Sequence, residues 1–268
     1  MRNDDSLPHP GSAANGLLPF APRARRTLRV FGADVELVWL PERAARPGRP
    51  GPDREAFRRD LGARIAATEA IERTATFTRT PNKFPFASAQ SVLWSERALR
   101  EPDVEFLTAA MQWLDQRGGT LLGNSIGAAA SIPRAHLHHT EEVLPFMSQL
   151  AEEPWTAVWL PREGGVEWCR KRVPFCLVGV RGEVEGMARA IAALQMSRMT
   201  AAVNVVATKG EAWVFPRAVE TPAPQFPYAL GAAEVWGRWC YLEERAFVSV
   251  RTEDLEQAFA SAGLANAG

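Results

Sequence analysis

The chain has 268 residues, of which 46% are hydrophobic and 23% are charged. This composition is typical of a globular protein and excludes a disordered or fibrous chain. Thirty-one basic residues balance 31 acidic ones, so no overall positive field would draw the protein to a polyanion. We therefore expect no nucleic-acid partner.

Cysteine usage and the N-terminus indicate the compartment. The three cysteines, Cys169, Cys176 and Cys240, form no Cys-x-x-Cys pair, which favours a reducing compartment over a disulfide framework. The N-terminus has acidic residues and prolines where a signal peptide would have a basic start and an apolar run. No window reaches about 18 uninterrupted apolar residues. We expect a cytoplasmic protein without a membrane span.

The N-terminal part of the chain begins with a polar segment. Residues 1–16 are rich in Gly, Pro, Asn and Ser and are predicted to form a disordered tail. Alternating apolar residues predict one or two strands between residues 27 and 39. After a loop dense in Pro, Gly and Arg, an apolar face that includes Leu61 and Ile65 predicts a helix over residues 54–74.

The middle of the chain is predicted to contain two pairs of strands separated by a helix. Residues 77–95 read as two strands joined by a turn at Pro81-Asn82. A start signal at Pro102-Asp103 and a stop signal at Gly118-Gly119 delimit the helix. Residues 120–146 follow as a strand, a loop of small residues and another strand.

The C-terminal part adds further strands and two helices. We expect strands within residues 155–161 and 175–182, a helix over residues 182–199, a hairpin over residues 201–217 and a closing helix over residues 252–263. Strands and helices are mixed without a regular βαβ rhythm. This predicts an α+β fold with a largely antiparallel sheet and flanking helices.

The histidines carry the most information about function. Outside the N-terminal tail, all of them lie within residues 136–139. If residues 133–140 form a strand, Arg134, His136 and His138 point to one face of the sheet. The small residues before this strand allow backbone amides to approach an anion. An imidazole nucleophile, a cation and an amide cradle together are what an attack on phosphorus requires.

The motif Asn-Ser-x-Gly-Ala-Ala-Ala-Ser-x-Pro-x-x-His-x-His resembles the active-site segment of the histidine-triad superfamily. It is most similar to the branch of galactose-1-phosphate uridylyltransferases, dinucleoside tetraphosphate phosphorylases and GDP-galactose phosphorylases. There, Ser-x-Pro leads into His-x-His-x-Gln, or into a third histidine in hydrolase relatives. Anchoring on Ser131 and Pro133 places Arg134 at the first histidine, His136 at the nucleophilic second one, and His138 at the glutamine or third histidine.

Two other segments agree with this resemblance. Asn82, Lys83 and Phe84 match an Asn-x-Phe segment that contacts the nucleotide base and ribose in the family. Residues 203–217, together with the small-residue segment that follows them, resemble the C-terminal part of the phosphorylases. The three motifs occur in the family's order, and the resemblance extends over residues 75–260.

The resemblance implies a fold and a division of the chain. The fold would be histidine-triad-like, either as one unit or as two fused divergent halves. Residues 17–150 would carry the histidine motif, and residues 151–268 would form a phosphorylase-like part packed against them.

The resemblance also implies double displacement. His136 would attack the α-phosphorus of a nucleoside diphosphate derivative, and a second acceptor would then take the nucleotide from the nucleotidyl-histidine. His138 would hydrogen-bond a phosphate oxygen or the leaving group. The residues expected to bind the nucleotide or nucleotide-sugar substrate, or to orient the loop around it, are Asn82, Lys83, Phe84, Asn124, Ser125, Gly127, Ser131 and Arg134.

One departure from the family pattern is Arg134. In zinc-bearing uridylyltransferases a histidine at this position and a Cys-x-x-Cys pair help to hold a structural metal; this chain lacks both. We therefore expect no metal and no cofactor. The arginine would either contact a phosphate directly or mark the loss of the original chemistry.

Three functions stay open at this point. The first is nucleotidyl transfer or phosphorolysis. The second is hydrolysis, favoured by His138 where transferases carry glutamine. The third is nucleotide binding without catalysis, motivated by Arg134. The sequence also leaves open a homodimer.

Overall fold

The computed structural model describes residues 16–45, 61–156, 165–197 and 202–266. Apart from Gly16, the predicted N-terminal tail lies outside the described residues, and so does the beginning of the helix predicted over residues 54–74. Within these ranges, no helix is long and apolar enough to cross a membrane.

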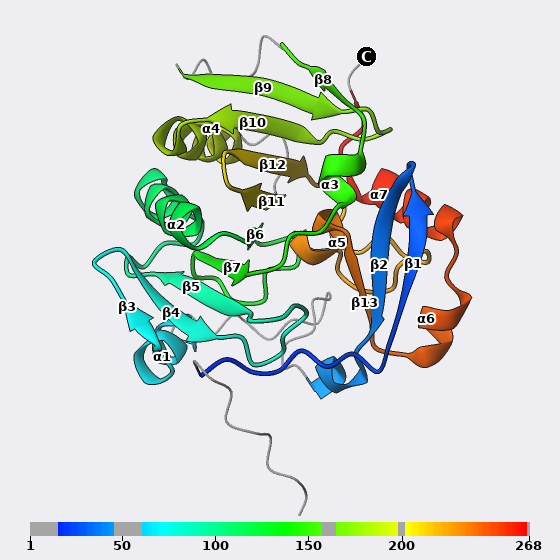
Figure 1. Ribbon diagram of the computed structural model, residues 1–268, viewed down its shortest axis with the longest axis horizontal. Coiled ribbons are helices and arrows are strands. Elements are labelled where there is room, and N and C mark those ends of the chain that lie inside the picture. The colour runs from blue at the N-terminus through cyan, green and yellow to red at the C-terminus, as the bar shows by residue number, and fades with distance from the viewer. Residues whose placement is uncertain (1–15, 46–60, 157–164, 198–201, 267–268) are drawn as a thin grey trace, which may run out of the picture.

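Two β-sheets organise the described part of the chain (Figure 1). The smaller sheet has the order β1 (Ala24–Val30), β2 (Ala33–Trp39) and β13 (Arg238–Tyr241). The larger sheet has the order β3 (Glu72–Arg73), β4 (Phe77–Pro81), β5 (Ser91–Ser95), β7 (His136–Thr140), β6 (Thr120–Asn124), β11 (Val203–Thr208), β12 (Glu211–Pro216), β10 (Val178–Gly182), β9 (Val166–Lys171) and β8 (Glu152–Pro154).

The strand pairings are antiparallel with one exception, the parallel pairing of β2 with β13. The helices are α1 (Leu61–Thr68), α2 (Val104–Arg117), α3 (Phe146–Gln149), α4 (Val184–Ser197), α5 (Ala232–Trp236), α6 (Glu244–Ser249) and α7 (Thr252–Ala262), with a 3-10 turn over Pro41–Ala45. The predicted α+β fold with a largely antiparallel sheet and flanking helices is confirmed.

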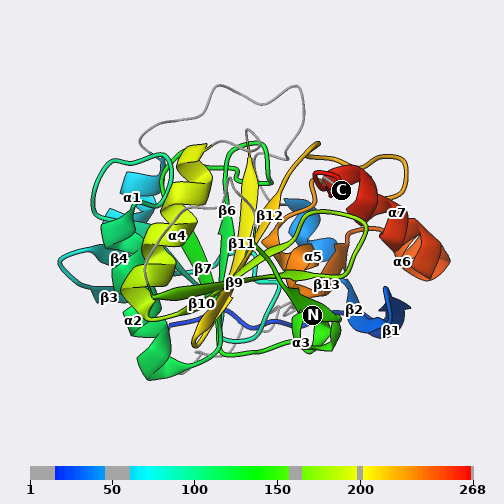
Figure 2. The same cartoon turned by 90° about the horizontal axis from the view of Figure 1, so that it is seen from above.

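The large sheet separates two hydrophobic cores. Helices α2 and α4 cover one face, whereas α5, α7 and the small sheet lie on the other (Figures 1 and 2). Alternate side chains of the central strands supply the two cores: on β6, Leu121 joins the core under α2 and α4, and Leu122 joins the core under α5 and the small sheet. Successive residues along a central strand therefore face opposite cores.

Helix α2 begins and ends where its sequence predicts. The side chain of Asp103 accepts a hydrogen bond from the backbone N–H of Phe106 at 2.9 Å, as an N-cap does. At the other end Gly118 has a φ of 74° and donates its N–H to the carbonyl of Leu114. Glycine adopts this left-handed backbone without strain, so the helix stops there.

The large sheet contains the same succession of elements twice. Three strands, a helix and two strands follow one another as β3, β4, β5, α2, β6 and β7, and again as β8, β9, β10, α4, β11 and β12. The two sets meet where β6 pairs with β11. Strand β7 carries the histidines, whereas the corresponding β12 carries Trp213 and Phe215. The division into residues 17–150 and 151–268 stays a prediction.

Two predicted boundaries are corrected by the structure. The helix expected to reach residue 74 ends at Thr68, because the chain after it forms β3 and pairs with β4. The strand expected over residues 133–140 begins at His136. Pro133 has no N–H to contribute to a ladder, and Ala135 donates its N–H to the carbonyl of Leu99, outside the strands. Arg134 is therefore not part of the strand.

A group of charged residues holds the far edge of the large sheet. Lys171 and Arg181 each donate to a carboxylate oxygen of Glu152 at 2.9 Å. The Lys171 ammonium also lies 4.2 Å from the centre of the Trp213 ring. The hydrogen bonds from Arg181 first, and then those from Lys171, outweigh the effect of burial and lower the pKa of Glu152 to about 2.

This group predicts a pH dependence of stability. Because the folded pKa of Glu152 lies below its ordinary value of 4.5, its contribution to the free energy of unfolding is complete above pH 4.5 and is lost as the pH falls toward 2. Urea unfolding across that window should show a shallower decline for Glu152→Gln than for the wild type. Glu253→Gln, at an exposed position of α7, should follow the wild type; equal slopes for both variants would contradict the assignment.

Candidate active site

Strand β7 lies between β5 and β6, and it presents its histidines to the two faces of the large sheet in turn. His136 and His138 share one face, and their ring centroids are 5.5 Å apart. Leu137 belongs to the core under α2 and α4. On that same side, the ring of His139 lies edge-on to the ring of Trp113 in α2, and the two ring centroids are 4.6 Å apart. The alternation predicted for these four residues is present.

His136 is held tightly and is only 7% exposed. Its ring stacks on Trp94, its neighbour across the β5–β7 pairing, with centroids 4.9 Å apart and an interplanar angle of 30°. The indole N–H of Trp94 in turn donates to Thr80 Oγ1 at 2.9 Å. This support fixes the plane of the imidazole.

A hydrogen bond sets the tautomer of His136. Its Nδ1 lies 2.6 Å from the backbone carbonyl of Arg134. A carbonyl oxygen can only accept, so Nδ1 carries the proton, and in the neutral ring the lone pair resides on Nε2. Nε2 is therefore the nucleophilic atom of this ring.

His138 is half-buried beside His136. The ring of Phe86 approaches it edge-on at 5.7 Å. The side-chain amide nitrogen of Gln90 lies 3.4 Å from Nδ1 of His138. His138 is thus oriented by residues from the connection between β4 and β5.

His139 serves the core. It is 3% exposed, and its Nε2 donates to the carbonyl of Gly118 at 3.0 Å. Burial lowers the pKa of His139 below its ordinary value, despite the opposing hydrogen bond to Gly118. This ring is neutral at physiological pH and packs behind the sheet.

Asn124, the last residue of β6, and Ser125, the first residue of the small-residue loop, hold the backbone in place with their side chains. Asn124 Oδ1 accepts from the side-chain amide of Asn204 at 2.8 Å and from the N–H of Ala232 at 2.7 Å. The hydroxyl of Ser125 donates to the carbonyl of Val203 at 3.0 Å and accepts from the N–H of Val203 at 2.7 Å. Both residues tie the loop to β11 and α5.

The rest of the loop is a compact turn. Gly127 has a φ of 87°, and a Cβ on it would lie 3.2 Å from that of Ala202. The N–H groups of Ala128 and Ala130 donate to the carbonyl of Ser125, and the N–H of Ala129 donates to Glu220 Oε1 at 3.0 Å. These three amides would have to exchange partners before they could bind a phosphate.

The loop ends at two residues predicted to contact phosphate. Ser131 is half-buried where the chain approaches β7. Arg134 donates from Nε to the carbonyl of Ser95 at 3.1 Å and from Nη2 to that of Glu96 at 3.2 Å. Its guanidinium therefore links the entry of β7 to the end of β5, and a phosphate contact stays a prediction.

Asn82, Lys83 and Phe84 lie in the connection from β4 to β5. Asn82 Oδ1 accepts from the N–H of Phe84 at 3.0 Å, and the N–H of Asn82 donates to the carbonyl of Gln90 at 3.2 Å. The exposed side chain of Lys83 forms an ion pair with the half-buried Glu69 at 2.7 Å. Gln90 thus connects this segment to His138, and the structure brings the two together.

Sequence reasoning missed four residues that organise the site: Gln90, Trp94, Asn204 and Arg217. Two of them were recognisable in the sequence. Trp94 ends one of the strands predicted over residues 77–95, and an aromatic side chain on a strand packs against side chains of the neighbouring strand. Asn204 is an amide within the apolar run Val-Asn-Val-Val-Ala, and a buried amide in such a strand requires hydrogen-bond partners. Gln90 shows no comparable signal, because its partner is 48 residues away.

Arg217 closes a buried network behind the loop. It is 3% exposed, and its Nη1 donates to Asn204 Oδ1 at 2.7 Å. The amide of Asn204 donates onward to Asn124 and to the carbonyl of Ala128 at 2.8 Å. Burial lowers the pKa of Arg217 to about 10, against the opposing charges of Glu234 and Glu220. The loop before the histidines is thus held from the C-terminal part of the chain.

Among the residues that the structure describes, no group of three or more His, Cys, Asp or Glu side chains could hold a metal ion. The three cysteines are buried free thiols. Burial raises the pKa of Cys169 and Cys176 to about 11 and that of Cys240 to about 12. None of these thiols forms an appreciable thiolate at neutral pH.

Yeast Ap4A phosphorylase is among the solved structures similar to this chain. Its complex with Ap4A has a TM-score of 0.70 at 15% identity, covering 94% of this chain and 93% of that one. A second structure of the yeast enzyme has a TM-score of 0.64 at 16% identity, covering 91% and 88%. An ADP-glucose phosphorylase from Arabidopsis thaliana has a TM-score of 0.41 at 12% identity, covering 91% and 100%.

No family model and no curated protein sequence matches the chain. The likeness to the yeast enzyme extends over nearly the full length of both chains, which confirms the histidine-triad-like fold predicted from the motifs.

Proposed function

We propose that the protein is a nucleotidyltransferase or phosphorylase that acts on a nucleoside diphosphate sugar or a dinucleoside polyphosphate. The reaction would pass through a nucleotidyl group on His136. The observation that supports it most is the fixed His136 ring: Nδ1 is hydrogen-bonded to the Arg134 carbonyl, which leaves the lone pair on Nε2, and the ring stacks on Trp94. The fold shared with yeast Ap4A phosphorylase supports it.

The first half-reaction forms a P–N bond and breaks a P–O bond. The lone pair on Nε2 of His136 attacks the α-phosphorus, and the bridging oxygen leaves with the sugar phosphate or the remaining nucleotide. The positive charge that develops on the His136 ring is stabilised because Nδ1–H donates to the Arg134 carbonyl. A neutral imidazole is nucleophilic, and the hydrogen bond at Nδ1 leaves the lone pair of the His136 ring on Nε2.

The second half-reaction reverses these bonds with another acceptor. An oxygen of inorganic phosphate or of a sugar phosphate attacks the same phosphorus, and the P–N bond breaks to return neutral His136. His138, on the same face and 5.5 Å away, would donate a hydrogen bond to a phosphate or leaving-group oxygen. We assign nucleoside binding to Asn82, Lys83 and Phe84.

We assign the phosphate side of the substrate to the loop and its end. Ser131 and Arg134 would contact phosphate oxygens, and Gly127 would let the backbone approach them. Asn124 and Ser125 would act by holding the loop in place, since their side chains bind β11 and α5.

Product analysis tests the reaction. The purified protein is incubated with a panel of nucleoside diphosphate sugars and dinucleoside polyphosphates, with and without inorganic phosphate or a sugar phosphate. Release of a nucleoside diphosphate only with phosphate, or of a new nucleotide sugar with a sugar phosphate, is the expected result. A nucleoside monophosphate formed without an acceptor would instead assign hydrolysis. Binding of nucleotide without consumption of any donor would overturn catalysis altogether.

A further inference from the structure

We propose that Gln90 is a positioning residue that fixes the tautomer of His138, so that His138 presents an Nε2–H donor to the substrate. The two histidines would then hold opposite tautomers: a lone pair on Nε2 of His136 and a proton on Nε2 of His138. This inference rests on the proposed function for its catalytic meaning, but the tautomer itself is a property of the resting protein.

The orientation of the Gln90 amide is set on its oxygen side. Gln90 is fully buried, and its Oε1 accepts the backbone N–H of Phe86 at 2.7 Å. An N–H can only donate, so the amide cannot be turned around without losing this hydrogen bond. The NH₂ group therefore faces His138.

The nitrogen side of the amide then determines the state of His138. Gln90 Nε2 lies 3.4 Å from His138 Nδ1. An amide NH₂ can only donate, so Nδ1 must accept and the ring proton of the neutral imidazole resides on Nε2. For His136 the partner of Nδ1 is a carbonyl oxygen, and the same reasoning gives the reverse assignment.

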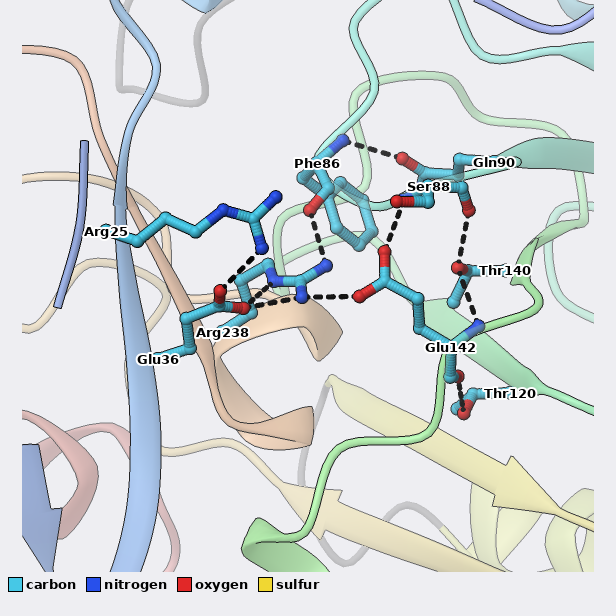
Figure 3. Close-up of polar contacts among 9 residues, drawn as sticks. All are labelled: Arg25, Glu36, Phe86, Ser88, Gln90, Thr120, Thr140, Glu142 and Arg238. Carbon is cyan, nitrogen blue, oxygen red and sulfur yellow. Dashed lines mark hydrogen bonds and ion pairs between the residues drawn. The ribbon is translucent and has the colours of Figure 1, made fainter. Parts of the chain in front are cut away.

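A buried ion cluster holds the Gln90 segment in place (Figure 3). Arg238 is 1% exposed and donates to the carbonyl of Phe86 at 3.1 Å, to Glu142 at 2.6 Å and to Glu36 at 2.6 Å. Glu142 also accepts from the N–H of Ser88. Phe86 and Ser88, both in the segment that leads to Gln90, are therefore fixed to the cluster, which preorganises the amide.

The chemical consequence is that the two histidines have different roles, His136 as nucleophile and His138 as hydrogen-bond donor. A neutral donor at Nε2 of His138 can stabilise the charge that develops on a phosphate oxygen as His136 attacks. If Nδ1 of His138 carried the proton instead, Nε2 would present a lone pair to that oxygen and repel it. Gln90 prevents this arrangement without touching the substrate.

Imidazole nitrogen NMR of the resting protein tests the tautomer without any substrate. The chain has four histidines, and His138→Gln identifies the signals of His138. At alkaline pH the expected result is an unprotonated Nδ1 and a protonated Nε2 for His138. In Gln90→Glu, whose carboxylate still accepts from Phe86 but can also accept from His138, Nδ1 should become protonated. A protonated Nδ1 in the wild type, or no change in Gln90→Glu, overturns the proposal.

Kinetics test the role of the tautomer. Gln90→Glu is expected to lower kcat by about 10- to 100-fold, the loss of one oriented donor. In His138→Gln the new side-chain amide can donate to the substrate regardless of the residue at position 90. Adding Gln90→Glu to this variant should therefore lower kcat no further. An equal loss in both backgrounds would mean that Gln90 acts only on the fold. Gln90→Met, which keeps the shape but has no amide, shows by thermal unfolding how much of any loss is structural.

The two failures are distinguishable. If the NMR assignment holds but no donor is consumed by the wild type, the proposed function fails and the tautomer stands. If donors are consumed but Nδ1 of His138 is protonated, the role of Gln90 fails and the proposed function stands.

Discussion

Replacing His136 by alanine is expected to lower the rate of nucleotidyl transfer by roughly four orders of magnitude, as removal of a covalent nucleophile does. No other imidazole of the strand can replace it as the nucleophile. Nδ1 of His138 is hydrogen-bonded to the Gln90 amide, and His139 faces α2 on the other side of the sheet. The steady-state rate of donor consumption at saturating donor measures the effect.

A matched variant separates chemistry from folding. In His136→Asn the side-chain amide can still donate to the Arg134 carbonyl, as Nδ1 does now, but it has no nucleophilic nitrogen. Both variants should be inactive, and the asparagine variant should unfold at a temperature close to that of the wild type. Turnover within tenfold of wild type in either variant would rule out His136 as the nucleophile.

Replacing Arg217 by methionine is expected to have the largest effect on stability, a loss of about 3–5 kcal/mol in the free energy of unfolding. The guanidinium donates to five acceptors: Asn204 Oδ1 and the carbonyls of Val219, Glu220, Leu230 and Ala262. Methionine fills a similar volume but leaves these buried acceptors without their donors. Urea unfolding measures the loss.

Two further variants define what the Arg217 result means. Arg217→Lys keeps the charge but has fewer donors in a different geometry, so it should lose part of the stability. Arg245→Met, at an exposed position of α6, should lie within about 0.5 kcal/mol of the wild type. If Arg217→Met unfolds like Arg245→Met, the network behind the loop does not stabilise the fold as described.

Local patterns in the sequence were sufficient for most of the elements. The caps of α2, the hairpin of β11 and β12, and the alternation from His136 to His139 all depend on residues within a few positions of one another. Such patterns express intrinsic backbone and side-chain preferences, and therefore they survive in the folded chain.

The arrangement around the histidines depends on contacts that no local pattern encodes. Asn124 and Asn204 face each other because β6 pairs with β11, a pairing of strands 80 residues apart. Arg134 precedes the strand, and its guanidinium donates to the carbonyls of Ser95 and Glu96, about 40 residues earlier in the chain. Periodicity identifies a strand, but it does not identify the strand's neighbours, so the partners of these side chains were not predictable.

The most direct test of the account is the mass of the intact protein after incubation with donor in the absence of a second acceptor. The reaction is quenched at alkaline pH, because the P–N bond of a phosphohistidine is labile in acid. We predict that the wild type gains the mass of one nucleoside monophosphate residue, that fragmentation maps it to His136, and that His136→Ala gains nothing. Donor consumption with the nucleotide on another residue, or an equal mass gain in His136→Ala, would contradict the account.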